Sequence, residues 1–296
     1  MTISNYFTQI CKEVDSLLDS IIPEENTYPP DIHKSMRYSV FAGGKRLRPM
    51  LTVAVCDALK GDRHQAMTLA AALELIHTYT LIHDDLPALD NDDLRRGLPT
   101  NHIQFNESTA ILTGDALLTL AFEVLADRLP KTGTDIKDIL IITAETAIAI
   151  GSTGTIGGQM VDIEMEGSGP NIAAVEYIHT HKTGELIVAC VRGAARLGGA
   201  TKNQLESMTS YGKQIGLAFQ IIDDILDLEG DEITLGKKLK SDVNKAKLTY
   251  PAIAGVKQSK EQACSLVDGS IEALSIFGTS ADHLRDLAKY TLTRTF

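Results

Sequence analysis

Several residue types are scarce in this chain of 296 residues. Tryptophan is absent, aromatic residues make up 5% of the chain, and the cysteines number only four. No two cysteines form a Cys-x-x-Cys pair, so the sequence offers neither a disulfide framework nor a zinc site. The pattern is typical of reduced thiols in a cytoplasmic protein. The four are Cys11, Cys56, Cys190 and Cys264.

Positive charge is also in short supply. The chain has 28 lysines and arginines against 39 aspartates and glutamates, which gives a formal net charge of −11. Phosphate backbones attract basic surfaces, so we expect no nucleic acid as a main partner. A small polyanion remains compatible with this charge, provided that cations cluster locally or metal ions bridge.

No long apolar run is present. A helix that spans a bilayer needs about 18 to 20 apolar residues, and the longest candidate, residues 139–150, is interrupted by Glu145. The first residues lack a basic start followed by an apolar stretch, so we expect no signal peptide. The sequence thus predicts a cytoplasmic protein without a membrane span.

Alternating, strand-like patterns are nearly absent, whereas apolar residues recur at helical spacing along the chain. We find no linker of low complexity and no shift in composition. The prediction is an all-α fold, a single domain over residues 1–296 with ten or more helices around a common centre. The periodicity is seen at Leu69, Leu73, Ile76 and Thr80, at Ala116, Leu120 and Val124, and at Leu217, Ile221 and Ile225.

Two similar acidic clusters end apolar helical segments, LIHDDLPALD at 81–90 and QIIDDILD at 220–227. In the second, Asp223 and Asp227 are four residues apart and project from one face of a helix, where like charges repel. Burial of carboxylates among isoleucines and leucines costs free energy unless a cation compensates for the lost water. Magnesium, which prefers oxygen ligands and is often shared with substrate phosphates, is the natural candidate.

The first cluster has a different spacing. Asp84 and Asp90 are six residues apart and would point in different directions on an ideal helix. Pro87 disrupts the helix between them, and a bulge there can bring Asp90 back beside Asp84. The two clusters can then present oxygens to one volume. The alternative is a solvated acidic helix end, which we prefer only for Asp92 and Asp93.

Basic residues accompany these clusters. In FAGGKRLRP (41–49), Gly43 and Gly44 permit close approach of a ligand to the backbone. Lys45, Arg46 and Arg48 follow, and arginine forks match phosphate oxygens. We interpret the segment as a diphosphate pocket. A plain basic helix start is less favoured, because cations there oppose the helix dipole.

Other polar residues fall near the same segments. His77 lies seven residues before Asp84 and shares its helix face within about 20°, which favours ligand contact over a core role. Arg95 and Arg96 directly follow the first cluster, as Lys237 and Lys247 follow the second. The pair His179 and His181 does not share a helix face, so no metal site is expected there.

The glycine-rich stretch GSTGTIGGQ (151–159) is not a phosphate loop, since no strand precedes it and no G-K-[ST] follows. Gly151, Gly154 and Gly158 form one helical stripe. Glycine costs about 1 kcal/mol in a helix, so close helix packing or a kink is the better explanation.

Together these motifs resemble the trans-prenyltransferases, or polyprenyl synthases, and are most similar to the bacterial short-chain farnesyl diphosphate synthases, which also have two extra residues in the first aspartate motif. The resemblance covers nearly the whole chain. The matching motifs are GGKRLRP (43–49), LIHDDLPALDNDDLRRGLPTNH (81–102), GDALL (114–118), GGQMVD (157–162), HKTGELI (181–187), IGLAFQIIDDILDLEGD (215–231) and TLGK (234–237).

The resemblance implies an all-α fold with helices around a deep central cavity, and a homodimer that condenses isopentenyl diphosphate with an allylic diphosphate. It also implies that Lys182, Thr183 and Gln220 place oxygens near the allylic cation, without a protein base. Three Mg²⁺ ions would be held by Asp84, Asp90 and Asp223. Isopentenyl diphosphate would be bound by Gly44, Lys45, Arg48, His77 and Arg96, and the allylic diphosphate by Arg95, Lys182, Thr183, Gln220, Lys237 and Lys247, with Lys245 as a competitor of Lys247.

Product length is expected to depend on Tyr79. The residue lies five positions before Asp84, about 7.5 Å along the helix. Its ring can close the cavity near fifteen carbons, the length of farnesyl diphosphate, whereas geranylgeranyl diphosphate has twenty. The alternative is that Tyr79 simply packs in the core.

Three other classes of protein fit less well. A class I terpene cyclase has little use for a second anion pocket and tends to have more aromatic residues. A non-catalytic prenyltransferase subunit typically lacks one aspartate motif, and both are present here. A metal-buffering acidic protein does not explain the cations.

Overall fold

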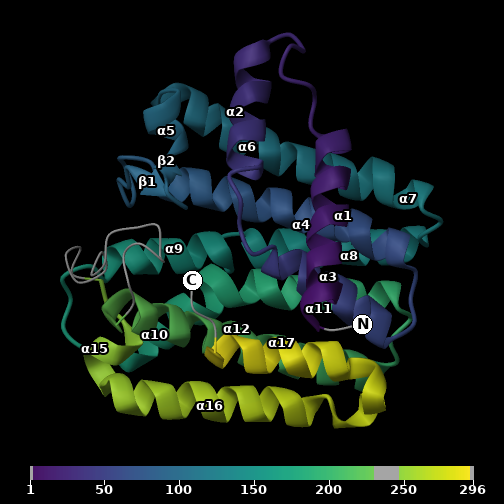
Figure 1. Cartoon of the computed structure of the whole chain (residues 1–296). Coiled ribbons are helices and arrows are strands. Elements are labelled where there is room, and N and C mark those ends of the chain that lie inside the picture. The colour runs from purple at the N-terminus through teal and green to yellow at the C-terminus, as the bar shows by residue number, and fades with distance from the viewer. Residues whose placement is uncertain (1–2, 230–246, 294–296) are drawn as a thin grey trace. The chain divides into compact units, whose positions relative to one another are not determined.

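Helices form nearly all regular structure in the part of the chain that the computed structural model describes, residues 3–229 and 247–293 (Figure 1). The expected all-α fold with more than ten helices is confirmed. The elements are α1 (Ile3–Ile21), α2 (Pro30–Val40), α3 (Leu47–Ala58), α4 (Arg63–Asp84), β1 (Leu94–Arg95), β2 (Leu98–Pro99), α5 (Asn101–Gln104), α6 (Glu107–Glu123), η1 (Val124–Arg128), α7 (Leu129–Lys131), α8 (Ile136–Ile150), α9 (Thr155–Glu164), α10 (Ile172–Ile178), η2 (His179–Gly184), α11 (Glu185–Leu197), α12 (Lys202–Glu229), α15 (Tyr250–Ala254), α16 (Val256–Ala273), η3 (Ser275–Ala281) and α17 (Asp282–Thr293).

The pattern of contacts between Cα atoms divides the chain into two compact units. Unit 1 comprises residues 1–53 and 63–139, and unit 2 comprises residues 54–62 and 140–296. Helices α3 and α8 each begin in unit 1 and end in unit 2. The expectation of one domain over 1–296 stays a prediction.

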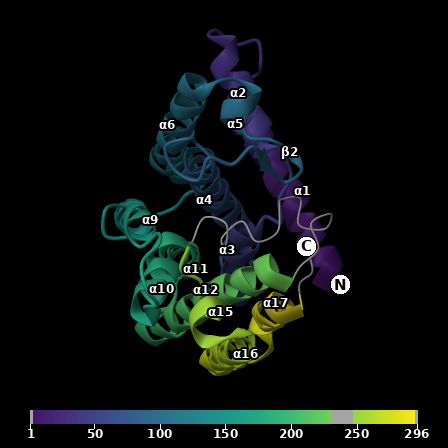
Figure 2. The same ribbon diagram turned by 90° about the vertical axis from the view of Figure 1, so that its left-hand side faces the viewer.

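Helix α4 is largely buried in unit 1. Every residue from Ala66 to Ile76 is buried, because alanine, leucine and isoleucine occur on all sides of this segment. A helix that is apolar all round is stable only inside a core. Helix α6 lies alongside α4 in Figures 1 and 2, and α4 carries His77, Tyr79 and Asp84 at its C-terminal end.

A short antiparallel hairpin follows α4. Leu94 pairs with Pro99, and Arg95 pairs with Leu98. The two turn residues, Arg96 and Gly97, both have positive φ angles, 55° and 76°, as a type I′ turn requires. The sequence analysis did not predict this hairpin, because each strand is only two residues long.

The core of unit 2 is organised around the long helix α12, which packs against α11 and α16 (Figure 2). Ile221, Ile222 and Ile225 of α12 contact Val175 and Tyr250 in one apolar cluster. The helical spacing of these isoleucines is the reason that α12 buries this face.

The glycine stripe is explained by both a break and close packing. A Cβ atom on Gly154 would overlap the carbonyl oxygen of Ala149, where α8 stops and α9 begins. A Cβ on Gly158 would overlap the backbone nitrogen of Lys182. Both expected roles of this stretch are therefore found, at different glycines.

Two helical stretches are long and apolar enough to cross a membrane by length and composition, residues 107–131 and 136–164. This is weak evidence, because core helices of soluble proteins meet the same test. The second stretch is broken between Ile150 and Thr155 and contains Glu145 paired with two arginines. The absence of a membrane span stays a prediction. None of the four cysteines forms a disulfide in the structure.

Candidate active site

The loop between α2 and α3 carries the first group of predicted binding residues. Gly43 and Gly44 have φ angles of 87° and 127°, a region that favours glycine. Lys45 is exposed, and Arg48 lies half-buried in the first turn of α3. The structure thus places Gly44, Lys45 and Arg48 on one tight turn in unit 1.

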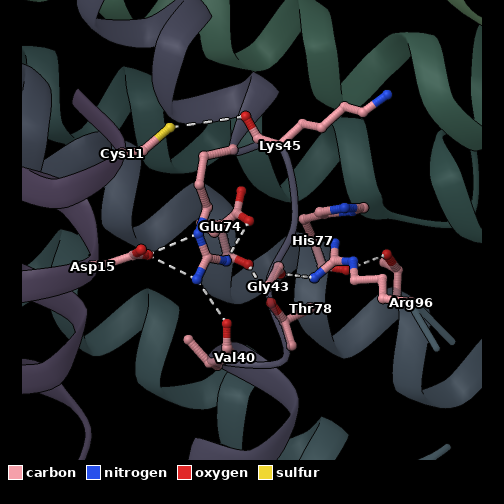
Figure 3. A network of polar contacts seen from close by, with 11 residues as sticks. Cys11, Asp15, Val40, Gly43, Lys45, Glu74, His77, Thr78 and Arg96 are labelled. Atoms are coloured by element: carbon pink, nitrogen blue, oxygen red, sulfur yellow. Dashed lines mark hydrogen bonds and ion pairs between the residues drawn. The ribbon is translucent and has the colours of Figure 1, made fainter. Parts of the chain in front are cut away.

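Arg46, between these residues, is turned into the protein. Its guanidinium donates to the carboxylates of Asp15 and Glu74, both at 2.8 Å, and to the carbonyl of Val40 at 2.7 Å. Figure 3 shows these three acceptors converging, while the side chain of Lys45 extends away from Asp15. Burial lowers the pKa of Arg46, but Glu74 and Asp15 outweigh burial and raise it overall. Arg46 was predicted to be one of the pocket cations, but its side chain points into the protein and pairs with Asp15 and Glu74 there.

Arg96 joins the same loop. Its guanidinium donates to the carbonyl of Gly43 (Figure 3). A Cβ on Gly44 would lie 2.6 Å from Cζ of Arg96, so a side chain at residue 44 would displace the guanidinium. Burial lowers the pKa of Arg96.

His77 lies among the cations of unit 1. The pKa of His77 is well below its usual value, first because the ring is buried and then because Arg48, Arg96 and Arg95 are near. Its buried Nδ1 has no hydrogen-bond partner among the described residues. Arg48, Arg95 and Arg96 therefore make the surroundings of His77 positively charged, and such a region suits an anion.

The first acidic cluster is shaped by a loop and not by a helical bulge. Helix α4 ends at Asp84, and the backbone N–H of Asp90 donates to the carbonyl of Asp84 at 2.9 Å. The backbones of Asp84 and Asp90 are thus adjacent, as expected, although the helix stops where the sequence analysis placed a bulge. Pro87 lies in this loop and is exposed.

The buried Asp85 and the half-buried Arg95 form an ion pair beside this loop. Nε and Nη2 of Arg95 donate to the Asp85 carboxylate at 2.8 and 2.5 Å. Burial raises the pKa of Asp85 against the lowering by Arg95. For Arg95, burial lowers the pKa, but Asp85 outweighs burial and raises it overall. The pair ties the hairpin to the end of α4, a role that sequence reasoning did not foresee for Arg95.

Tyr79 is buried in α4, with 6% of its surface exposed. Its ring meets that of His83 edge-on, with centroids 5.8 Å apart, and burial raises the pKa of Tyr79. Nε2 of His83 lies 3.0 Å from the carbonyl oxygen of Ile111, and a Cβ on Gly114 would overlap the His83 ring. Tyr79 is thus held in place by the tight contact of α4 with α6.

In unit 2, Lys182 and Thr183 lie in the π-helical turn η2. Such turns are rare and occur frequently at functional sites. Nζ of Lys182 donates to Asp162 of α9 at 2.8 Å, and Nζ of Lys247 lies 3.7 Å from the same carboxylate oxygen. Asp162 is buried. Asp162 is thus a shared partner of two predicted binding residues, Lys182 and Lys247. Asp162 itself was not predicted from the sequence as a site residue.

The second acidic cluster lies near the C-terminal end of α12. Gln220 and Asp223 are half-buried there. Asp224 is buried, accepts from the backbone N–H of Tyr250 at 2.8 Å and lies 3.2 Å from Nε2 of His179. The second aspartate of this pair therefore joins α12 to η2 and α15.

The predicted residues fall in both units, and two lie outside the described residues. These two are Lys237 and Lys245, the competitor of Lys247, and both belong to residues 230–246. The facing of the two acidic clusters stays a prediction. Gly44, Lys45, Arg48, His77, Tyr79, Asp84, Asp90, Arg95 and Arg96 belong to unit 1, and Lys182, Thr183, Gln220, Asp223 and Lys247 to unit 2.

The donor sets of both clusters suit a hard divalent cation. Asp84, Asp90 and Asp223 supply only carboxylate oxygens, the ligands that Mg²⁺ prefers. Within residues 3–229 and 247–293, no group of three acidic, histidine or cysteine side chains by itself forms a metal site. Each cluster therefore fits one or two ligands to a metal that other oxygens complete.

The class of protein follows from comparison of this chain with known proteins. Residues 29–272 match the polyprenyl synthetase family, and the chain belongs to that family. The protein is thus a prenyltransferase of the trans type.

Individual relatives differ in the product that their names give. The chain is 44% identical over 277 residues to the farnesyl diphosphate synthase of Escherichia coli, covering 92% of this chain and 91% of the relative. It is 43% identical over 282 residues to the geranylgeranyl diphosphate synthase of Cyanophora paradoxa, covering 95% and 93%.

Solved structures agree with this fold. An apo FPP/GFPP synthase from Zymomonas mobilis is similar with a TM-score of 0.88 at 38% identity, covering 98% of both chains. A geranyltransferase from Helicobacter pylori, complexed with magnesium and isoprenyl diphosphate, has a TM-score of 0.86 at 30% identity, covering 99% of this chain and 97% of that one.

Proposed function

We propose that the protein condenses isopentenyl diphosphate with dimethylallyl or geranyl diphosphate to give (2E,6E)-farnesyl diphosphate. The observation that carries the fifteen-carbon product is the position of Tyr79. Its ring is 6% exposed, is fixed against His83, and lies five residues before Asp84 on α4. A fixed ring at this depth, about 7.5 Å along the helix, would stop a tail that grows past Asp84 along α4.

The binding of isopentenyl diphosphate is assigned to unit 1. Lys45, Arg48 and Arg96 supply positive charge, and arginine forks hold phosphate oxygens through paired hydrogen bonds. Gly44 lets the diphosphate approach the backbone. The neutral His77 supplies a ring N–H in an environment that already carries several cations.

The binding of the allylic diphosphate is assigned to Lys182, Thr183, Gln220, Lys247 and Lys237, with Arg95 as a further cation. Support comes from Lys182 and Lys247, which share Asp162. Thr183 and Gln220 each present an oxygen that can stabilise positive charge on the substrate.

Magnesium is proposed as the cofactor, with three ions held by Asp84, Asp90 and Asp223. Support comes from the all-oxygen donor set and from the Helicobacter pylori structure that contains magnesium. When bound, magnesium would stabilise the negative charge of the departing diphosphate.

The reaction needs no basic side chain. The allylic C–O bond breaks, diphosphate leaves with the electron pair, and an allylic cation remains. The double bond of isopentenyl diphosphate attacks this cation, and a proton from the new cation passes to the released diphosphate. Apolar walls exclude water, which would otherwise capture the cation.

Geranylgeranyl diphosphate is the second candidate product. The specific observation in its favour is the Cyanophora paradoxa enzyme of that name, which is as similar to this chain as the farnesyl enzyme from Escherichia coli. The two candidates differ by one addition of isopentenyl diphosphate.

The deciding experiment is incubation with labelled isopentenyl diphosphate and either dimethylallyl or geranyl diphosphate, with Mg²⁺ or with EDTA. We expect a fifteen-carbon product that requires Mg²⁺. A twenty-carbon main product would replace the proposed function by the second candidate, and the absence of any condensation would overturn both.

Tyr79→Ala is expected to lengthen the product, because removal of the ring opens space below the allylic site. The product is measured by chromatography after dephosphorylation. Tyr79→Phe is the matched control, since it keeps the ring and should keep the fifteen-carbon product. An unchanged product length in Tyr79→Ala would show that Tyr79 only packs in the core.

We also propose that the protein acts as a homodimer in the cytoplasm. The homodimer is supported by apolar side chains that remain exposed on α8 and α9, and the location by four free cysteines. Fractionation of cells that express the protein tests the location, and recovery with membranes would contradict it.

A further inference from the structure

Arg46 differs from the other cations of its loop in the direction of its side chain. Lys45 is exposed and Arg48 is half-buried, whereas Arg46 is 4% exposed. Its φ angle is 49°, in a region that residues other than glycine seldom adopt. A backbone in this conformation persists only where its surroundings hold it.

Three acceptors hold Arg46 from three different elements. Asp15 lies on α1, Glu74 on α4, and Val40 ends α2 (Figure 3). Nε donates to Asp15, Nη1 to Glu74 and Nη2 to Val40, and Nη2 also lies 2.8 Å from the Asp15 carboxylate. The planar fork of arginine can meet three fixed acceptors in this way, and the ammonium of lysine cannot reproduce that geometry.

This arrangement connects the loop to the helix that carries His77. Glu74 precedes His77 by three residues and lies on the same side of α4. The carbonyl of Arg46 also accepts from the backbone N–H of Met50 at 3.0 Å, so Arg46 begins the first turn of α3 that carries Arg48. One side chain therefore sets the position of the loop relative to α4.

Arg96 depends on the same loop. Its guanidinium donates to the carbonyl of Gly43 and lies against Cα of Gly44 (Figure 3). If the loop moves, Arg96 loses both contacts. The conformation of residues 43–48 thus determines where Lys45, Arg48 and Arg96 lie relative to His77.

We propose that Arg46, held by Asp15 and Glu74, is a positioning residue for the isopentenyl diphosphate site, which it serves without touching the substrate. The inference rests on the proposed function, because that function assigns Lys45, Arg48, His77 and Arg96 to isopentenyl diphosphate. Loss of either carboxylate lets the loop depart from its conformation and weakens isopentenyl diphosphate selectively. The allylic substrate is unaffected in its binding.

Asp15→Asn is the principal variant, because the Asp15 side chain is 45% exposed and asparagine has nearly the same shape, so we expect the fold to be kept. Glu74→Gln is the second variant and tests the buried carboxylate. Glu13→Gln is the matched control. Glu13 pairs with Arg63 at 3.1 Å and also joins α1 to α4, and within the described part of the chain its polar contacts are with Arg63 and Gln9 and not with the loop.

Two measurements are made on the full chain of each variant. Steady-state kinetics give the KM for each substrate with the other saturating, and calorimetry gives the Kd of isopentenyl diphosphate alone. In Asp15→Asn and Glu74→Gln we expect the Kd and KM for isopentenyl diphosphate to rise about tenfold, as for one lost charged hydrogen bond. In the same two variants, the KM for the allylic substrate should stay within about twofold of that of the unaltered chain. In Glu13→Gln, the Kd and the KM for isopentenyl diphosphate should also stay within about twofold.

The outcomes separate this inference from the proposed function. Unchanged values in both variants, or equal increases for both substrates, would overturn the positioning role. Selective loss of isopentenyl diphosphate binding in a chain that forms no condensation product would support the role and overturn the proposed function. If the unaltered chain does not bind isopentenyl diphosphate, both fail.

Discussion

At the scale of single residues, the carboxylate of Asp162 pairs with two predicted binding lysines. Asp162 ends the motif GGQMVD, but the motif alone does not reveal this pairing. Asp162 is buried on α9 and receives Lys182 from η2 at 2.8 Å and Lys247 at 3.7 Å. A buried carboxylate between two cations offsets their mutual repulsion and limits their motion. Asp162 therefore acts on both predicted allylic-diphosphate lysines together.

Asp162→Asn is expected to raise the KM for the allylic diphosphate about tenfold, since both lysines lose a charged partner. The KM for isopentenyl diphosphate should change little. Glu145→Gln is a matched control, because Glu145 also pairs with two cations of unit 2, Arg192 and Arg196, and neither is a predicted binding residue. Equal effects of the two variants on the allylic KM would refute the role of Asp162.

His77 makes the stability of the protein depend on pH. Its pKa in the folded chain is well below the usual 6.5, because of burial and the nearby arginines. Below about pH 6.5 the unfolded chain binds a proton at His77 that the folded chain does not, so stability falls as the pH decreases. The slope approaches about 1.4 kcal/mol per pH unit for one proton.

His77→Asn removes this contribution, so its free energy of unfolding should fall less steeply between about pH 6.5 and 5. Urea unfolding of both proteins across this range measures the difference. Parallel pH profiles would mean that His77 binds protons equally in the folded and unfolded chains.

At the scale of elements, the approach of α9 to η2 depends on Gly158. Because a Cβ there would overlap the backbone of Lys182, Gly158→Ala should destabilise the protein by about 1–3 kcal/mol. Thermal unfolding measures this loss. Gly169→Ala is the control, because a Cβ at Gly169 meets nothing within 4 Å. A Tm for Gly158→Ala equal to that of the control would contradict the close packing.

The sequence predicted elements better than the partners of site residues. Helical periodicity and the scarcity of strand patterns are local properties, so the all-α fold followed from them. The pairs Arg46–Asp15, Arg46–Glu74 and Lys182–Asp162 join residues 31, 28 and 20 positions apart. No local spacing encodes such a pair, because it depends on how helices pack.

The same limit applies to the first acidic cluster. The sequence predicted that Asp90 returns to Asp84, because Pro87 cannot continue a helix. It did not predict that the helix would end at Asp84 or that the hairpin would be tied back by Arg95 and Asp85. Those features depend on a type I′ turn and on burial, which a single motif does not show.

At the scale of the whole molecule, exposed apolar residues indicate a partner surface. Leu140 and Ile148 of α8 are 65% and 64% exposed, and Ile156 and Met160 of α9 are both 54% exposed. Each pair follows helical spacing, so each forms a stripe on one side of its helix. Exposed stripes of this kind mark interfaces, and a second copy of the chain is the occupant that we propose.

Leu140→Asp combined with Ile148→Asp is expected to convert the proposed dimer to monomers, because the interface would have to bury two unpaired carboxylates. Sedimentation velocity measures the assembly state. Ile276→Asp is the control, since Ile276 is also exposed but lies on η3. A double variant that remains dimeric would place the interface elsewhere.

The π-helical turn η2 has a consequence for how this chain can change in length. α10, η2 and α11 form one uninterrupted helical run from Ile172 to Leu197, and the wide turn accommodates one more residue than an α-helix would. Deleting Thr180 would let the run continue as a plain α-helix, so the fold would survive. The same deletion would remove the wide turn that carries Lys182, so the side chain would leave its present direction toward Asp162. The loss of one residue would then preserve the fold and weaken the binding of the allylic substrate.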